Sequence, residues 1–238
     1  VCYTREFRNP RTDTFKAILY SGLLCIFVFT VVPLAFQGSL GLGQLVTPAV
    51  LDAAGVHEPV HLVGTSMGAH SAVAFALQWP GRVACMVLAS GGTGGRSNFH
   101  PALPEGVRSM LDFYQEPTAA RMRSFLECVV FDSSALTAEM MQQKLAAAMA
   151  CPQHLTNFVE SLRQHPAQFG DVTHRLAEIT LPTLVIWGSE DRVVPLDIGL
   201  QIAQRIPGAD LHVLGRCGHV PHLERPHDVN HLLTRFLA

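Results

Sequence analysis

Short runs of apolar residues alternate with longer segments of helical periodicity over most of the chain. Short runs that are mostly apolar and β-branched predict buried strands, at residues 59–63, 83–89, 183–187 and 211–214. Helical patterns lie before, between and after them, at residues 44–54, 69–79, 196–205 and 227–237. Strands that alternate with helices in this way predict a mostly parallel α/β sheet.

The alternation is interrupted in the middle of the chain. Between residues 104 and 179 the pattern is helical, with helices predicted at 104–114, 117–129, 137–149 and 152–164 and proline near several of their starts. We therefore predict a helical cap over residues 96–179. It is inserted into an α/β core formed by residues 51–95 and 180–238.

Residues 1–50 form an atypical N-terminal segment. The chain begins with Val1, and basic residues precede an uncharged apolar run at residues 17–36. Three interpretations remain open: a membrane anchor over 17–36, a buried strand over 25–32, or a foreign or mistranslated end. The strands that would precede residue 59 are expected to be incomplete.

Composition narrows the function classes. A chain of 238 residues can bury one full core with an insertion. Its net charge is −2 and it has no basic block, which argues against nucleic acid as a partner. Six cysteines without a C-x-x-C pair predict reduced thiols of a cytoplasmic protein, with a membrane anchor through 17–36 as the alternative. No metal-ligand spacing occurs among the twelve histidines, and we expect no metal or cofactor.

The chain is organised around the sequence Gly-Thr-Ser-Met-Gly at residues 64–68. This G-x-S-x-G spacing joins a predicted strand to a predicted helix. A serine on such a sharp turn has strained dihedrals, and flanking glycines let the backbone segments pass closely. Ser66 is thus a candidate nucleophile, and the Met67 N–H at the start of the helix a candidate oxyanion donor. The alternative is an ordinary Gly/Ser turn.

Two further polar residues follow the ends of predicted strands. Asp191 comes after residues 183–187 and His219 after residues 211–214. The carboxyl ends of parallel strands face one crevice, so both side chains are expected beside Ser66. His219 would take the Ser66 proton and Asp191 would orient the imidazole. Alternatively, Asp191 is only a helix cap and His219 only a loop histidine.

With Ser66, Asp191 and His219 in this order, the chain from about residue 51 to 238 resembles the α/β-hydrolase superfamily. More narrowly, it is similar to the meta-cleavage-product hydrolases, which hydrolyse C–C bonds in ring-fission products of aromatic degradation. The likeness rests on GTSMG, SGGTGG, PEGVRSMLDFY, QHLTNF, DVTHRLAEI, WGSEDRVVPLDIGL and CGH. It implies a 2-hydroxy-6-oxo-dienoate substrate, a ketonised intermediate, and water attack or acyl transfer at the distal ketone.

The sequence departs from that family at expected substrate contacts. Thr65 stands where the family usually has Asn, Val220 where it usually has Trp, and Lys144 where an Arg usually holds the substrate carboxylate. Lysine keeps the charge but lacks the bidentate fork. The family's His-Gly loop, which gives the second oxyanion donor, has no counterpart before Ser66.

Three functions follow from these observations. The leading one is a serine-dependent C–C bond hydrolase. A carboxylic ester or lactone hydrolase is the first alternative, and a non-catalytic or membrane-tethered relative is the second. The resemblance also implies that the chain forms a homo-oligomer.

Overall fold

The structure of the chain is a computed structural model that describes residues 48–99, 102–164 and 170–237. The chain divides into two compact units, residues 1–57 and 58–238. In the first unit the described element is α3 (Pro48–Ala53). The apolar run 17–36, with the strand considered at 25–32, lies outside the described residues. Within the described ranges, no helix combines the length and apolar character needed to cross a membrane.

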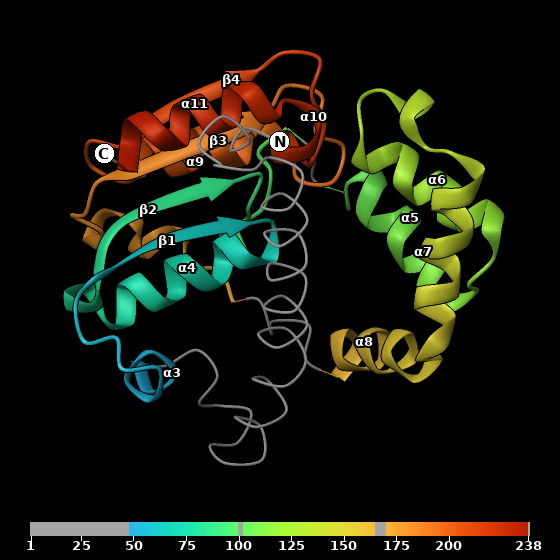
Figure 1. Cartoon of the computed structure of the whole chain (residues 1–238), viewed down its shortest axis with the longest axis horizontal. Coiled ribbons are helices and arrows are strands. Elements are labelled where there is room, and N and C mark those ends of the chain that lie inside the picture. The colour runs from blue at the N-terminus through green and yellow to red at the C-terminus, as the bar shows by residue number, and fades with distance from the viewer. Residues whose placement is uncertain (1–47, 100–101, 165–169, 238) are drawn as a thin grey trace, which may run out of the picture. The chain divides into compact units, whose positions relative to one another are not determined.

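The second unit contains a four-stranded parallel sheet. Its strands lie in the order β1-β2-β3-β4, as Figure 1 shows; their bounds are β1 (Val60–Thr65), β2 (Val83–Ala89), β3 (Thr183–Gly188) and β4 (Asp210–Leu214). Parallel pairing places all four carboxyl ends at one edge of the sheet. The predicted parallel α/β architecture is confirmed.

β1 runs farther than the sequence predicted. Gly64 and Thr65 continue the strand because they pair with Leu88 and Ala89 of β2. Within the described residues β1 is an edge strand, and its residue Val63 is 55% exposed.

Helices cover the sheet on both faces. α4 (Met67–Gln78) lies against β1 and β2, and α9 (Leu196–Arg205) against β3 and β4. On one face, Leu184 and Ile186 pack against Leu233 and Phe236 of α11 (Pro226–Leu237). Trp187, on the other face of β3, is fully buried and packs against α9. The short helices η3 (Pro80–Arg82) and α10 (Pro221–Glu224) were not predicted.

The helical insertion lies between β2 and β3 in the chain. Its helices begin and end within two residues of the predicted bounds: α5 (Glu105–Gln115), α6 (Ala119–Val129), α7 (Ala138–Ala150) and α8 (Pro152–Gln164), with η4 (Ser133–Ala135) and η5 (Thr173–Glu178) as short turns. They enclose an apolar cluster of their own: Phe113, Met122, Leu136, Met141 and Leu155. The methionines buried here are therefore ordinary core residues of the insertion.

The two ends of the insertion are tied together where it leaves and re-enters the core. The Val172 N–H donates to the Thr93 carbonyl at 2.9 Å, and the hydroxyls of Thr93 and Thr173 are 2.8 Å apart. At the start of α5, the Gly106 N–H donates to the Arg192 carbonyl at 2.9 Å. The insertion is thus attached to the loops that follow β2 and β3.

Candidate active site

Ser66 lies on the turn between β1 and α4. Its dihedrals, φ 54° and ψ −119°, are ones that L residues rarely adopt. The turn is held because the Ser66 N–H donates to the Ala89 carbonyl at 3.0 Å. Both the strain and the hydrogen bond fix the direction in which the Ser66 hydroxyl points.

The two glycines of the motif differ in their surroundings. A Cβ on Gly64 would lie 2.5 Å from the Gly68 carbonyl oxygen and 2.6 Å from the Ala69 Cα, so only glycine lets the strand pass the helix. A Cβ on Gly68 would meet no described atom within 4 Å. The expectation that both flanks must be small therefore holds for Gly64, while Gly68 faces open space.

Asp191 follows β3 and is the buried end of the polar network. Its side chain has no exposed area. One carboxylate oxygen, Oδ1, accepts from the N–H groups of Val193 and Val194 at 2.8 and 2.9 Å. The other, Oδ2, lies 2.9 Å from His219 Nδ1. Both oxygens of the carboxylate are thus held by hydrogen bonds, Oδ1 by two backbone N–H groups and Oδ2 by the His219 ring, and this fixes the orientation of the carboxylate.

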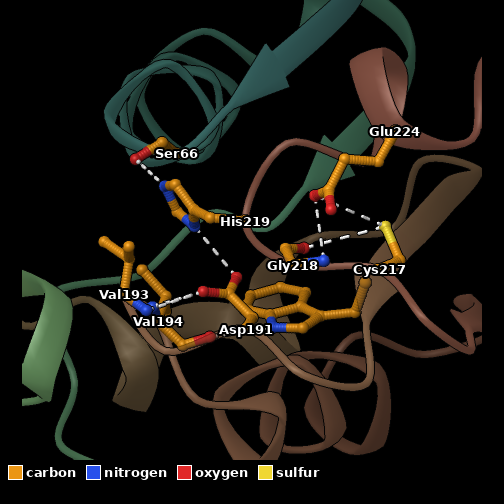
Figure 2. A network of polar contacts seen from close by, with 9 residues as sticks. Ser66, Asp191, Val193, Val194, Cys217, Gly218, His219 and Glu224 are labelled. Atoms are coloured by element: carbon orange, nitrogen blue, oxygen red, sulfur yellow. Dashed lines mark hydrogen bonds and ion pairs between the residues drawn. The ribbon is translucent and has the colours of Figure 1, made fainter. Parts of the chain in front are cut away.

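His219 connects Asp191 to Ser66. It lies in the buried loop after β4, and its Nε2 is 2.9 Å from the Ser66 Oγ (Figure 2). Because a carboxylate can only accept, the proton of neutral His219 lies on Nδ1 and Nε2 has a free lone pair. That lone pair accepts the Ser66 O–H. The structure thus brings together the three side chains that the sequence analysis selected.

Two titratable side chains near His219, Cys217 in the loop and His222 in α10, are neutral near pH 7. Burial, and to a lesser extent the negative charge of Glu224, raise the pKa of the Cys217 thiol to about 12. Desolvation lowers the pKa of His222, and the proximity of His219 lowers it again. A buried, protonated thiol is a poor nucleophile, so Cys217 does not compete with Ser66.

The remaining predicted residues make no hydrogen bond to this network among the described residues. Met67 is the first residue of α4, so its N–H has no intrahelical acceptor. Thr65 ends β1 and is half-buried, and Val220 directly follows His219. Lys144 is exposed on α7. The roles of these residues stay predictions. Most of the chain before Ser66, where the family carries its His-Gly loop, lies outside the described residues.

Sequence reasoning missed the residues that hold the His219 loop. The Glu190 carboxylate accepts the Cys217 N–H at 3.0 Å, and the Glu190 N–H donates to the Cys217 carbonyl at 3.1 Å. Glu224 contacts the same loop from α10. A carboxylate next to Asp191, and another five residues after His219, were the available signals. Within the described ranges, no cluster of three or more His, Cys, Asp or Glu side chains could hold a metal.

The sequence profile of the α/β hydrolase family matches residues 31–232 of the chain. The chain belongs to the α/β hydrolase family. The match includes residues 31–50, so the family likeness of this hydrolase begins upstream of residue 51, where the resemblance was placed.

Curated relatives of this α/β hydrolase are nearly half identical to it over the aligned residues. The 2-hydroxy-6-oxononadienedioate/2-hydroxy-6-oxononatrienedioate hydrolase of Paraburkholderia phymatum is 48% identical over 83% of this chain and 68% of its own length. The enzyme of the same name, numbered 1, from Dechloromonas aromatica is 44% identical over 87% of this chain and 71% of its own length.

Solved structures of related hydrolases have a similar fold. The meta-cleavage product hydrolase CumD of Pseudomonas fluorescens IP01 has a TM-score of 0.69 and 30% identity, over 79% of this chain and 67% of its own. The 2-hydroxy-6-oxo-6-phenylhexa-2,4-dienoate hydrolase of Rhodococcus sp. strain RHA1 has a TM-score of 0.68 and 26% identity over the same shares. An N-acyl homoserine lactone degrading enzyme has a TM-score of 0.62 and 29% identity, over 79% of this chain and 71% of its own.

Proposed function

We propose that this α/β hydrolase cleaves a C–C bond in a meta-cleavage product of the 2-hydroxy-6-oxo-dienoate type. The observation that carries the proposal is the chain of contacts from Ser66 through His219 to Asp191, with 2.9 Å at each step. It occurs in a chain that is 48% identical to a hydrolase named for a substrate of this type. The substrate is a small molecule.

Ser66 is the nucleophile of the proposed reaction, His219 carries the protons, and Asp191 supports His219. After ketonisation of the dienoate, the Ser66 Oγ attacks the distal ketone while its proton passes to His219 Nε2. Asp191 stabilises the imidazolium that forms. The C–C bond then breaks, and the carbon leaving group takes the proton from His219. Water hydrolyses the acyl-enzyme with His219 as general base, or attacks the ketone directly in the route without acyl transfer.

The negative charge that develops on the ketone oxygen requires a donor. The Met67 N–H is our candidate, because it lies at the N-terminus of α4 beside Ser66 and the helix dipole favours an anion there. Loss of one such donor typically lowers kcat by a factor of about 10²–10³. We assign substrate contacts to Thr65 and Val220, which flank Ser66 and His219, and the substrate carboxylate to Lys144.

A second function is favoured by the substitutions at the substrate contacts. Thr65, Lys144 and Val220 replace the Asn, Arg and Trp that the dienoate hydrolases usually carry. The network from Ser66 to Asp191 is equally suited to acyl transfer from an ester or lactone. The fold likeness to a lactone-degrading enzyme agrees with this alternative.

A comparison of kcat/KM between substrate classes distinguishes the two functions. We expect purified protein to hydrolyse a 2-hydroxy-6-oxo-dienoate with a higher kcat/KM than aryl acetates or N-acyl homoserine lactones. The Ser66→Ala variant is the control for each substrate. A preference for esters or lactones, with the dienoate untouched, would replace the C–C assignment by the second function.

We further propose a cytoplasmic location, on the basis that the described cysteines are free thiols: Cys85, Cys128, Cys151 and Cys217. A membrane tether through residues 17–36 is the alternative. Co-sedimentation of the full chain with lipid vesicles distinguishes the two, since only the tethered form pellets with lipid. Sedimentation without vesicles reports whether the chain forms the homo-oligomer that we propose.

A further inference from the structure

The loop that carries His219 lies directly against the end of cap helix α6. The His219 N–H donates to the Val129 carbonyl at 2.8 Å. A Cβ on Gly218 would lie 2.6 Å from the Val129 oxygen and 3.0 Å from the Phe131 nitrogen. The backbones of residues 129–131 and 218–219 are therefore in contact with no side chain between them.

Glu224 joins these two backbone segments through both oxygens of its carboxylate. Oε2 accepts from the Phe131 N–H at 2.6 Å, and Oε1 accepts from the Gly218 N–H at 2.9 Å. The Cys217 Sγ is 3.9 Å from Oε1. Figure 2 shows Glu224 beside Cys217 and Gly218, next to the network of Ser66, His219 and Asp191. Hydrogen bonds to a charged carboxylate are stronger than those between neutral groups.

We infer that Glu224 is a positioning residue for His219. It does not contact Ser66 or Asp191; it fixes the residue before His219 and the cap segment that holds the His219 N–H. Misplacement of a reacting group by about 1 Å can cost about 10²-fold in rate. Glu224 therefore keeps Nε2 at bonding distance from the Ser66 hydroxyl. The inference rests on the proposed role of Ser66 and His219, and not on the identity of the substrate.

The test is the Glu224→Gln variant. Its side chain has nearly the same shape, but one end of the carboxamide is an NH₂ donor, so the N–H of either Phe131 or Gly218 loses its acceptor. We expect the second-order rate constant for phosphonylation of Ser66 by a fluorophosphonate probe to fall by about tenfold or more. On any substrate that the wild type accepts, kcat should fall similarly with KM nearly unchanged.

Two further measurements separate positioning from a general loss of structure. The low-field proton resonance of His219 Nδ1–H, which reports its hydrogen bond to Asp191, should shift or broaden in the variant. Thermal unfolding measures the folded fraction. The matched control is Glu116→Gln. The Glu116 carboxylate accepts from the Arg121 guanidinium at 2.7 Å within the insertion, and it makes no hydrogen bond to the His219 loop. It should react with the probe at the wild-type rate.

Several outcomes would overturn the inference. One is a wild-type rate of phosphonylation in Glu224→Gln; another is a loss that only follows the folded fraction. If this variant does not fold, Glu224→Asp keeps the charge but shortens the reach, and a wild-type rate would again contradict us. Failure of both variants to fold would assign Glu224 a purely structural role. Because the probe needs only Ser66 and its base, wild-type labelling without dienoate turnover would reject the C–C proposal and leave this test valid.

Discussion

At the scale of single residues, orientation is what distinguishes Ser66 from an ordinary serine. Asp191 binds two backbone N–H groups through one oxygen and the His219 ring through the other. The ring cannot turn without breaking that bond, so Nε2 stays directed at the Ser66 Oγ. Removal of the negative charge from Asp191 should therefore act through the tautomer of His219 and not through the shape of the site.

The Asp191→Asn variant tests this account of the network. An amide in this place can donate to Nδ1 and thereby move the ring proton to Nε2, which leaves no base for the Ser66 proton. We expect kcat to fall by about 10⁴-fold with the fold retained, as for the equivalent change in serine proteases. Turnover and fluorophosphonate labelling of Ser66 both measure the effect.

The control for this variant is Asp197→Asn. Asp197 is also a buried carboxylate, but it accepts from the Ser97 hydroxyl and the Asn98 N–H, both at 2.7 Å, and is not part of the network. Its variant should label at the wild-type rate. Equal labelling rates in Asp191→Asn and the wild type would show that His219 acts without Asp191.

At the scale of elements, the turn from β1 to α4 sets the position of Ser66. The end of the strand and the first turn of the helix are in contact at Gly64, and the strained dihedrals of Ser66 follow from this close passage. Gly68 lies one residue into the same helix turn but faces open space among the described residues. The two glycines should therefore respond differently to the same substitution.

We predict that Gly64→Ala disrupts the site and that Gly68→Ala is tolerated. The added Cβ on Gly64 would force the strand from the helix, at a cost of about 1–3 kcal/mol in the free energy of unfolding, and would displace Ser66. Thermal unfolding and labelling of Ser66 measure both effects. Equal behaviour of the two alanine variants would contradict the close contact at Gly64.

Pattern alone predicted the elements whose own sequence decides them. The ends of β2, β3 and the helices α5 to α8 of the insertion lie within about two residues of the bounds that the sequence predicts. β1 was predicted too short because the pairing of Gly64 and Thr65 with β2 is a tertiary contact. The four-residue helix α10 was missed because so short a helix has no periodicity to detect, and with it the role of Glu224.

At the scale of the whole molecule, the rule that parallel strands end at one edge predicted the site. It predicted that Asp191 and His219 lie beside Ser66. In the sequence, His219 is 28 residues from Asp191 and 153 residues from Ser66, and it contacts both. The contacts of Val129 with the His219 loop and of Phe131 with Glu224 could not be predicted. They involve backbone groups at a helix end and in a distant loop, and such contacts leave no pattern in the side chains. Substrate contacts, which need a bound ligand, rest on the resemblance.

The proposed role of Lys144 links the cap to the substrate. If Lys144 binds the dienoate carboxylate, Lys144→Ala loses a charge-assisted hydrogen bond of about 1.5–3 kcal/mol, and KM for the dienoate should rise by about tenfold or more. The KM for a neutral aryl ester should not change. Lys144→Arg should bind the carboxylate at least as well, because its fork is bidentate.

The control for Lys144 is Arg163→Ala, which removes an exposed cation of α8 that pairs with Glu160 at 3.2 Å. It should leave KM for both substrates unchanged. A dienoate KM in Lys144→Ala equal to that of the wild type would remove Lys144 from the binding site.

The most direct test of the account is the loss of the yellow colour of a 2-hydroxy-6-oxo-dienoate on addition of purified protein. We predict that the wild type removes the colour and forms the two products of C–C hydrolysis, and that Ser66→Ala is slower by a factor of about 10³ or more. Folded wild-type protein that leaves the colour unchanged, or a Ser66→Ala variant as fast as the wild type, would contradict the account.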